Sequence, residues 1–252
     1  MLTLPLCPDT TYPHLNSPET RWHLPRLHPG DTRRLARELD LPELLVRLLA
    51  ARGYSTPGQI RQFLEPTGAQ LHKPDTLPDI APATRRVCSA VNNRERILVC
   101  GDYDVDGVTG TALLVSALRR LDADVISYLP HRATEGYGFS SRVVQFARAE
   151  GARLVITNDC GISDHERVAA CNDSGIDVII TDHHEPGPTL PPALAVINPK
   201  RPDSAYPFSE LAGVGVAFKL VWSTLSALGR PKDELLDLFD LVALGTIADV
   251  VP

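Results

Sequence analysis

The segment Ile97–Gly107, with the sequence ILVCGDYDVDG, passes from four apolar residues directly into three aspartates at alternate positions. A short apolar run of this kind, bounded by glycine, is typical of a buried β-strand. Similar runs follow at 125–129, 154–157, 178–181 and 194–197. The segments between the first four runs have the spacing of amphipathic helices, which indicates βαβ units and parallel strands. We therefore expect an α/β fold with a doubly wound, five-stranded parallel sheet.

Acidic and imidazole side chains follow three of these five runs. They are Asp102, Asp104 and Asp106 after the first run, Asp159 after the third, and Asp182, His183 and His184 after the fourth. Ligands of an open parallel sheet bind outside the carboxyl ends of its strands, so we expect these side chains to lie at one edge. Taken alone, the three aspartates could form a solvated loop, because aspartate favours turns. The 182–184 triplet could also cap a strand end, and Asp249 could be a turn residue or a helix cap.

The combination of these groups favours a metal site. Several carboxylates removed from water repel one another, at a cost of roughly several kcal/mol, unless a cation compensates their charge. Oxygen ligands with one or two imidazoles and no thiolate favour manganese or magnesium over zinc, and five or more ligands suffice for two ions. Two such ions stabilise both the entering and the leaving oxygen at a phosphorus atom. The matching reaction is phosphoester hydrolysis.

The composition is that of a globular protein. Of 252 residues, 43% are hydrophobic and 22% are charged, so the chain can bury a sizeable core. The net charge of -6 argues against nonspecific nucleic-acid binding by the whole surface, although a local basic track can accompany an acidic site. Five cysteines without a C-x-x-C pair are typical of reduced thiols. Because no apolar run approaches ~18 residues, we expect a soluble, cytoplasmic protein that does not contact membranes.

We expect a small helical module before the α/β domain. Residues 1 to about 30 are rich in proline, threonine and histidine and should form a loosely held arm. Leucines between 35 and 49 have the spacing of short amphipathic helices broken at Pro42, and a further short helix should end at Leu64. A proline-rich connection spans 66–82. We place the domain boundary near residue 76, which divides the chain into 1–76 and 77–252.

Four motifs resemble those of the DHH phosphoesterase superfamily. They are Asp102–Gly107 (DYDVDG), Asn158–Ile162 (NDCGI), Asp182–His184 (DHH) and Gly245–Pro252 (GTIADVVP). Within the superfamily the chain resembles the RecJ family of single-strand-specific 5′-to-3′ exonucleases. The stretches that carry this finer resemblance are Arg132–Gly138, Asn198–Lys200 and Leu211–Gly215.

The resemblance implies a role for individual residues. The implied ligands of two manganese or magnesium ions are Asp102, Asp104, Asp106, Asp159, His183 and Asp249, with Asp159 as a bridge. The implied catalytic residues are Asp104, Asp106, Asp159, His183 and His184. The implied substrate contacts are Arg132, His184, Gly213 and Gly215. Asp182 is expected to orient its histidine neighbour without binding metal itself.

The implied activity is release of 5′-mononucleotides from the 5′ end of single-stranded DNA, in DNA repair and recombination. RecJ-family enzymes normally continue with a second α/β lobe and an OB-fold domain, and we expect both to be absent from this chain. The activity of the chain by itself is therefore left open. The resemblance also suggests a single-strand-binding protein or a helicase as partner. The alternatives are a nanoRNase or nucleotide phosphatase of the same superfamily, and a noncatalytic replication-associated scaffold.

Overall fold

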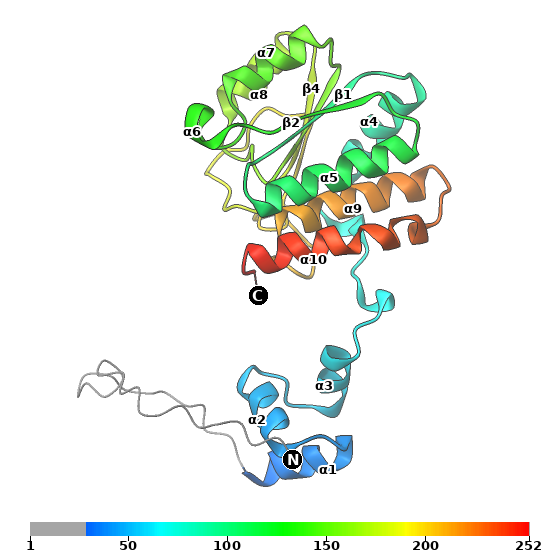
Figure 1. Cartoon of the computed structure of the whole chain (residues 1–252), viewed down its shortest axis with the longest axis vertical. Helices are drawn as coiled ribbons and strands as arrows, with labels where there is room; N and C mark the ends of the chain where they lie inside the picture. The colour runs from blue at the N-terminus through cyan, green and yellow to red at the C-terminus, as the bar shows by residue number, and fades with distance from the viewer. Residues whose placement is uncertain (1–28, 252) are drawn as a thin grey trace, which may run out of the picture. The chain divides into compact units, whose positions relative to one another are not determined.

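The computed structural model describes residues 29–251, which fall into two compact units that divide between Leu71 and His72 (Figure 1). The arm expected at residues 1 to about 30 lies almost wholly outside the described residues. The domain boundary expected near residue 76 stays a prediction. Each unit is described by itself below.

The first unit contains the short helices expected on either side of Pro42. They are α1 (Pro29–Leu39), α2 (Glu43–Ala51) and α3 (Pro57–Leu64). Thr56 begins α3 with a capping box, in which its hydroxyl accepts from the Gln59 N–H and the Gln59 side chain accepts from the Thr56 N–H. A small core of five buried residues joins the three helices: Leu35, Ala36, Val46, Leu49 and Ile60.

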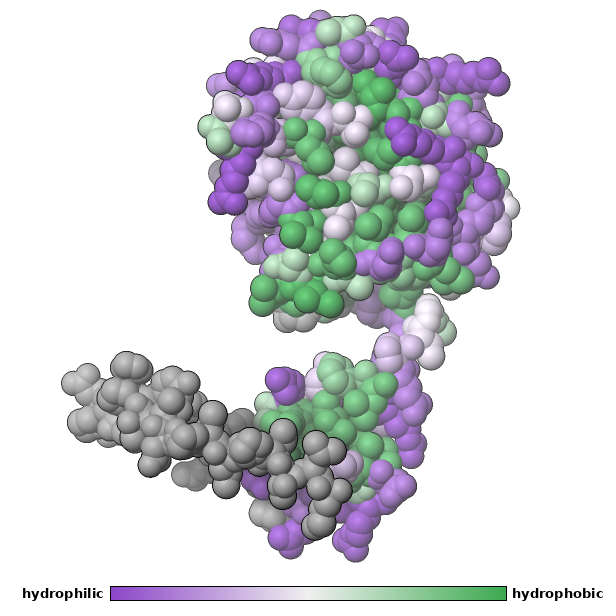
Figure 2. Space-filling view, viewed as in Figure 1, coloured by the Kyte–Doolittle hydropathy of each residue, from purple (hydrophilic) through white to green (hydrophobic). Residues whose placement is uncertain are grey.

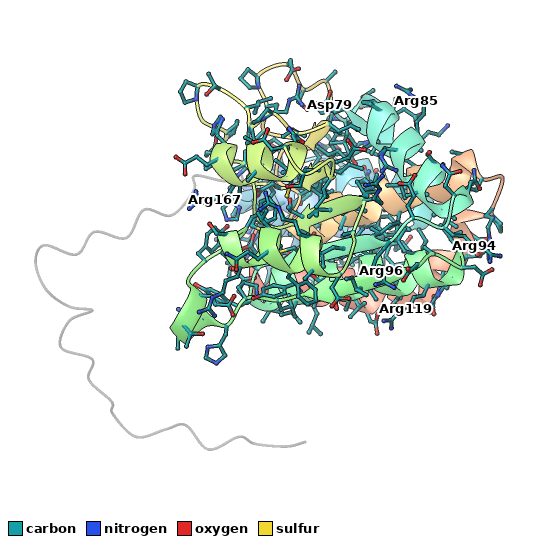
Figure 3. The ribbon with its side chains drawn as sticks, turned by 90° about the horizontal axis from the view of Figure 1, so that it is seen from above. Asp79, Arg85, Arg94, Arg96, Arg119 and Arg167 are labelled. Carbon is teal, nitrogen blue, oxygen red and sulfur yellow. The ribbon has the colours of Figure 1, made fainter. Side chains whose placement is uncertain are left out.

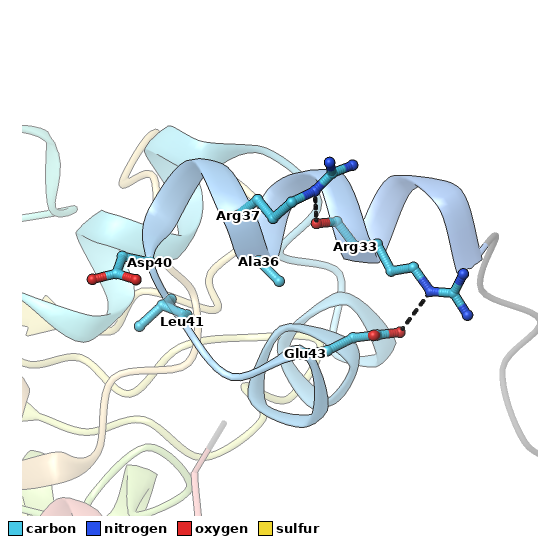
Figure 4. A pocket seen from close by; sticks show the side chains of 6 residues that line it. All are labelled: Arg33, Ala36, Arg37, Asp40, Leu41 and Glu43. Atoms are coloured by element: carbon cyan, nitrogen blue, oxygen red, sulfur yellow. Dashed lines mark hydrogen bonds and ion pairs between the residues drawn. The ribbon is translucent and has the colours of Figure 1, made fainter.

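One pocket of this unit lies between α1 and α2 (Figure 4). Two arginines line it, and both are engaged within the unit. Arg33 Nε lies 3.6 Å from the Glu43 carboxylate, and Arg37 Nε donates to the Arg33 carbonyl at 3.4 Å. Within the described part of the chain, the lining includes the acidic residues Asp40 and Glu43 but no histidine and none of the residues that the sequence predicts for the functional site.

The proline-rich connection is shorter than predicted. Two 3-10 turns, Gly68–Gln70 and Pro74–Thr76, are followed by helix α4 (Ile80–Asn92). The prediction that the connection extends to Pro82 is wrong, because Pro82 lies in the first turn of α4. A proline is tolerated there since the first N–H groups of a helix have no partner within the helix.

The predicted five-stranded parallel sheet is confirmed. Its strands are β1 (Ile97–Gly101), β2 (Val125–Tyr128), β3 (Leu154–Asn158), β4 (Asp177–Thr181) and β5 (Ala195–Ile197). They are all parallel and lie in the order β2-β1-β3-β4-β5. The register aligns Gly101 with Asn158, Asn158 with Thr181, and Thr181 with Ile197. Four strands therefore end level, and the residues that follow them emerge at one edge.

Helices cover both faces of the sheet, as the doubly wound fold requires (Figure 1). On one face lie α5 (Val105–Arg120), α9 (Gly213–Ala227) and α4, with α10 (Phe239–Ala248) packed outside on α5 and α9. On the other face, α7 (Ser141–Ala149) and α8 (His165–Asn172) contribute to a core with β1, β3 and β4. Two short elements, α6 (Arg132–Glu135) and the 3-10 helix Lys232–Leu238, lie in connections. Within residues 29–251 we find no helix that is both long and apolar enough to cross a membrane.

Basic residues gather at the opposite edge, where the strands begin. Arg94, Arg96 and Arg119 lie near one another there (Figure 3). Arg96 is held in ion pairs, with its Nε 3.0 Å from Asp124 and a terminal nitrogen 3.5 Å from Glu150. Arginines and carboxylates are thus paired with one another at this edge.

Candidate metal centre

Seven acidic and imidazole residues meet at the carboxyl edge of the sheet. They form three groups in which the possible ligand atoms lie within 4.8 Å of one another: Asp102, Asp104 and Asp159; Asp106, His183 and Asp249; and Asp159, His183 and His184. All six residues that the sequence predicts as metal ligands occur in these groups. Asp159 and His183 each belong to two of the groups, so the three form one continuous cluster.

Asp106 is held in place by the first turn of α9. Its two carboxylate oxygens accept hydrogen bonds from the Gly213 N–H at 2.6 Å and the Val214 N–H at 2.8 Å. Free N–H groups at a helix start favour a negative charge in this position. Burial nonetheless raises the pKa of Asp106, against the effect of these hydrogen bonds. The carboxylate therefore enters the cluster from a rigid element.

The expectation that Gly213 and Gly215 approach substrate stays a prediction, and the structure shows what surrounds the two glycines. Both glycines are buried, and the Gly213 N–H is already used by Asp106. A Cβ atom at Gly213 would lie only 2.8 Å from the Asp159 Cβ atom and 3.1 Å from Asp106 Oδ2. The absence of a side chain at Gly213 thus permits α9 to approach the carboxylates.

Asp159 is the most perturbed carboxylate of the cluster. It follows β3 with a φ of 60°, a left-handed conformation that is uncommon outside glycine, asparagine and aspartate. Burial, together with the charges of Asp106 and Asp104, raises its pKa to about 10. Such a strained and buried acid is typical of a functional site. A divalent cation could replace the proton that this carboxyl holds at neutral pH.

His183 directs one ring nitrogen into the carboxylates. Its Nε2 atom lies 3.0 Å from Asp159 Oδ1, 3.6 Å from Asp106 Oδ2 and 3.7 Å from Asp249 Oδ2. The side chain is buried, and its Nδ1 atom has no hydrogen-bond partner among the described residues. The Asp249 carboxylate reaches the Nε2 atom of His183 from the C-cap of α10. Segments far apart in the sequence therefore supply the ligands of one group.

Asp182 lies behind the cluster and is fully buried. Its carboxylate accepts hydrogen bonds from the backbone N–H groups of Ile162, His183 and His184 and contacts His184 Nδ1 at 2.8 Å. Burial by itself would raise the pKa of Asp182, but the hydrogen bonds and the charge of His184 bring the pKa below its usual value. In turn, the bond to Asp182 raises the pKa of His184. This geometry agrees with an orienting role for Asp182, which stays a prediction.

The first motif supplies two carboxylates in different environments. Asp104 is exposed and caps α5 by accepting from the Gly107 N–H at 2.9 Å. Asp102 is buried and accepts from the Gly138 N–H at 3.2 Å, and burial raises its pKa. A Cβ atom at Gly107 would lie 2.5–2.7 Å from the Asp102 backbone, so the tight turn requires glycine.

Arg132 lies at the rim of the cluster and is exposed. Its guanidinium carbon is 5.0 Å from the centroid of the Tyr103 ring. Tyr103 contacts Tyr137 edge to face, with ring centroids 6.4 Å apart, and Tyr137 contacts His184 in the same way at 6.0 Å. The Tyr137 hydroxyl also donates to the Asp159 carbonyl at 3.1 Å. Sequence reasoning missed both tyrosines, although each lies inside a motif that had been singled out.

The donor set fits hard divalent cations. Seven carboxylate or imidazole side chains converge, most of the carboxylates are partly desolvated, and possible oxygen ligands outnumber nitrogen ligands. Thiolate ligation does not fit, because Cys160 lies in the hydrophobic core and its pKa is raised well above the usual value. The cluster contains all six residues that the sequence predicts as ligands, together with His184, and their role as ligands stays a prediction.

Comparison with known proteins identifies the class that this fold and site define. Residues 96–246 match the DHH family, N-terminal domain, and the chain belongs to that family. Within the family it is similar to RecJ. The single-stranded-DNA-specific exonuclease RecJ of Bacillus subtilis (strain 168) is 42% identical over 232 residues, which are 92% of this chain and 29% of that protein. RecJ of Escherichia coli (strain K12) is 44% identical over 225 residues, 84% of this chain and 38% of that protein.

Solved structures give the same result. A crystal structure of RecJ from Thermus thermophilus in complex with Mn²⁺ aligns with a TM-score of 0.72 and 36% identity, over 91% of this chain and 31% of that chain. A crystal structure of exonuclease RecJ bound to manganese aligns with a TM-score of 0.64 and 43% identity, over 70% of this chain and 44% of that chain. The chain thus spans less than half the length of these relatives.

Proposed function

We propose that this chain carries the catalytic centre of a metal-dependent exonuclease that degrades single-stranded DNA from the 5′ end to 5′-mononucleotides, in DNA repair and recombination. The observation that carries the proposal is the meeting of six candidate ligands from four motifs at one sheet edge. The names of the relatives, single-stranded-DNA-specific exonucleases, support the choice of substrate.

Two manganese or magnesium ions would be held by the three groups of the cluster, with Asp159 shared between them. When bound, such ions neutralise phosphate charge and promote attack of water on phosphorus. The RecJ structures in complex with Mn²⁺ support this choice of metal. The proton held by the Asp159 carboxyl would leave as the ions bind.

The remaining site residues would act on the substrate and on their neighbours. Arg132 would contact a phosphate from the rim, since it is exposed and beside Tyr103. The half-exposed ring of His184 would contact the scissile phosphate, held in place by Asp182. Tyr103 and Tyr137 would border the same path as flat apolar surfaces. Action in the cytoplasm, with a single-strand-binding protein or helicase as partner, completes the proposal.

Product analysis tests the proposal. Single-stranded DNA labelled at the 5′ end is incubated with the chain and manganese, beside a 3′-labelled strand, a duplex and a dinucleotide. We expect labelled mononucleotide to appear first from the 5′-labelled single strand, and EDTA to stop its release. Release from dinucleotides alone would favour a nanoRNase or nucleotide phosphatase. No hydrolysis of any substrate would contradict the proposal and favour a scaffold.

A further inference from the structure

Residues 131–138, which we call the rim segment, border the carboxylate cluster and touch it at several points. Three contacts join the segment to the site: the Gly138 N–H donates to Asp102 at 3.2 Å, the Tyr137 hydroxyl donates to the Asp159 carbonyl at 3.1 Å, and Arg132 lies over the Tyr103 ring at 5.0 Å. The position of the rim segment thus determines where Arg132, a predicted substrate contact, lies. It also determines where the Tyr137 hydroxyl and the Gly138 N–H meet the candidate ligands Asp159 and Asp102.

The rim segment has little stability of its own. Its only helix, α6, has four residues, which is far too short to be stable by itself. Arg132, Ala133 and Thr134 are all exposed, so no apolar burial fixes this turn. Gly136 and Gly138 follow with φ values of 79° and 76°, which the chain adopts without steric restriction at glycine. The contacts of Tyr137 and Gly138 hold the end of the segment, so the turn before them needs a contact of its own.

Glu135 supplies that contact. One of its carboxylate oxygens accepts from the Tyr128 hydroxyl at 2.5 Å, and the other accepts from the His131 N–H at 3.1 Å. Tyr128 ends β2, and its ring packs on Phe146 of α7 with centroids 5.1 Å apart. The Glu135 side chain is 9% exposed, although the rest of the turn is open to solvent. The carboxylate thus ties the segment to the sheet and also closes the turn on itself.

The pKa shifts of Glu135 and Tyr128 agree with a strong hydrogen bond between these two side chains. The hydrogen bond from Tyr128 lowers the pKa of Glu135, and the same bond raises the pKa of Tyr128 to about 12. At neutral pH the tyrosine therefore keeps its proton and donates it to a charged acceptor, which makes the hydrogen bond stronger than a neutral one.

A surface ion pair is the simpler interpretation of Glu135, and it does not explain the geometry. Arg142 lies 3.9 Å from Glu135, but the arginine side chain is 62% exposed. Exposed pairs of this kind contribute little. The ion pair also involves only one of the two carboxylate oxygens, whereas both are used in the bonds to Tyr128 and His131.

We propose that Glu135 is a positioning residue of the active site: together with Tyr128 it holds the rim segment so that Arg132 and Tyr137 face the substrate path. The inference rests on the proposed function. Among the described residues, the Glu135 carboxylate contacts Tyr128, His131 and Arg142 but no candidate metal ligand. Because the turn that it holds carries the predicted substrate contact Arg132, loss of the bond should raise KM and leave kcat nearly unchanged.

Four variants test the inference: Glu135→Ala, Glu135→Gln, Tyr128→Phe and, as control, Arg142→Gln. Kinetics are measured on 5′-labelled single-stranded DNA with manganese, and hydrogen exchange is measured on residues 131–138 without substrate. We expect Glu135→Ala and Tyr128→Phe to raise KM on the order of tenfold, with kcat within about twofold, as for loss of a hydrogen bond to a charged group. Both should speed amide exchange in the rim segment.

The other two variants separate positioning from charge. Glu135→Gln can still accept from His131 and donate to the Tyr128 oxygen, so it should largely restore KM. Arg142→Gln removes the ion pair only and should behave as wild type. Unchanged KM and exchange in Glu135→Ala would overturn the inference, as would a loss confined to kcat. If the wild type releases no nucleotide, the proposed function fails, and amide hydrogen exchange of residues 131–138 decides the inference alone. Unchanged protection of these amides in Glu135→Ala and Tyr128→Phe would then overturn it. Lost protection would support the role of Glu135 in holding the rim segment.

Discussion

Asp159 combines, in one residue, a strained backbone, a buried carboxylate and a place in two ligand groups. We expect Asp159→Asn to lower the rate of nucleotide release by more than about a hundredfold, since loss of a direct ligand should exceed the 10–100-fold cost of losing an outer partner. Asparagine is preferable to alanine because it tolerates the left-handed conformation. The metal-free variant should gain about 0.5–2 kcal/mol in stability, because the Asp159 carboxyl must take up a proton on folding to be buried uncharged, whereas asparagine needs none.

Thermal unfolding in EDTA, beside the nuclease assay, checks this prediction. Asp173→Asn is a matched control, since Asp173 is exposed at the C-cap of α8 and belongs to none of the three ligand groups. Normal turnover of Asp159→Asn would contradict a shared ligand, and a less stable metal-free variant would contradict the electrostatic argument.

The raised pKa of Asp159 also sets a pH dependence. An unperturbed aspartate has a pKa of 3.8, and the folded chain raises this value to about 10. Between these values the folded state holds a proton that the unfolded state has released, so metal-free stability should fall as the pH rises from about 4 towards 10. Manganese replaces the proton, so its affinity should rise with pH. Calorimetric titration of EDTA-treated protein with manganese, in two buffers of different ionisation enthalpy, should detect released protons. Manganese binding without proton release would contradict the argument that Asp159 holds a proton which the metal displaces.

Single residues show how far the sequence predicts the site. Carboxylates and histidines after apolar runs were identifiable because side chains at strand ends follow from chain order alone. The hydrogen bonds of Asp182, the contact of Tyr137 with the Asp159 carbonyl and the bond between Glu135 and Tyr128 were not predictable. These contacts depend on how turns fold over the sheet edge, which no local pattern encodes.

At the scale of elements, the first turn of α9 contacts the site through its backbone, since the N–H groups of Gly213 and Val214 donate to Asp106. We expect Gly213→Ala to destabilise the fold by about 1–3 kcal/mol, because its Cβ atom would collide with Asp159 and crowd Asp106. Nuclease activity should fall at least about tenfold for the same reason. Chemical denaturation and the nuclease assay give the two readouts.

Gly215→Ala is the matched control one step along the helix. Its Cβ atom would meet the flexible end of the Leu211 side chain at 3.3 Å. The free energy of unfolding should therefore change by less than about 1 kcal/mol, and activity should be retained. A selective loss of activity in Gly215→Ala would instead support the prediction that this glycine approaches substrate.

Elements also differ in how well the sequence predicts them. The strands were identifiable because each is a buried apolar run, and their parallel order follows from the helical segments between the first four. The early start of α4 was missed since Pro82 was taken as part of a connection. The packing of α9 and α10 beside α5 could not be predicted, because it joins segments more than 90 residues apart and leaves no local pattern.

At the scale of the molecule, α10 is apolar on nearly every side. Asp240 is its only charged residue. One side packs on α5 and α9, yet Leu244 is 57% exposed and Ile247 is 76% exposed. Val105 and Val108 are exposed on the neighbouring first turns of α5. Figure 2 shows hydrophobic residues gathered over this end of α10. An exposed apolar surface of this kind marks an interaction site or a tendency to associate.

We expect this surface to drive concentration-dependent self-association of the 252-residue chain. Replacing Leu244 and Ile247 together by glutamine should lower the weight-average mass measured by sedimentation velocity at high protein concentration. The free energy of unfolding should change by less than about 0.5 kcal/mol per substitution, since both side chains are exposed. Leu194→Gln is the control, because Leu194 is an exposed apolar residue of the loop before β5. Equal association of the double variant and the wild type would show that another surface is responsible, whereas reduced association only in the double variant would assign it to α10.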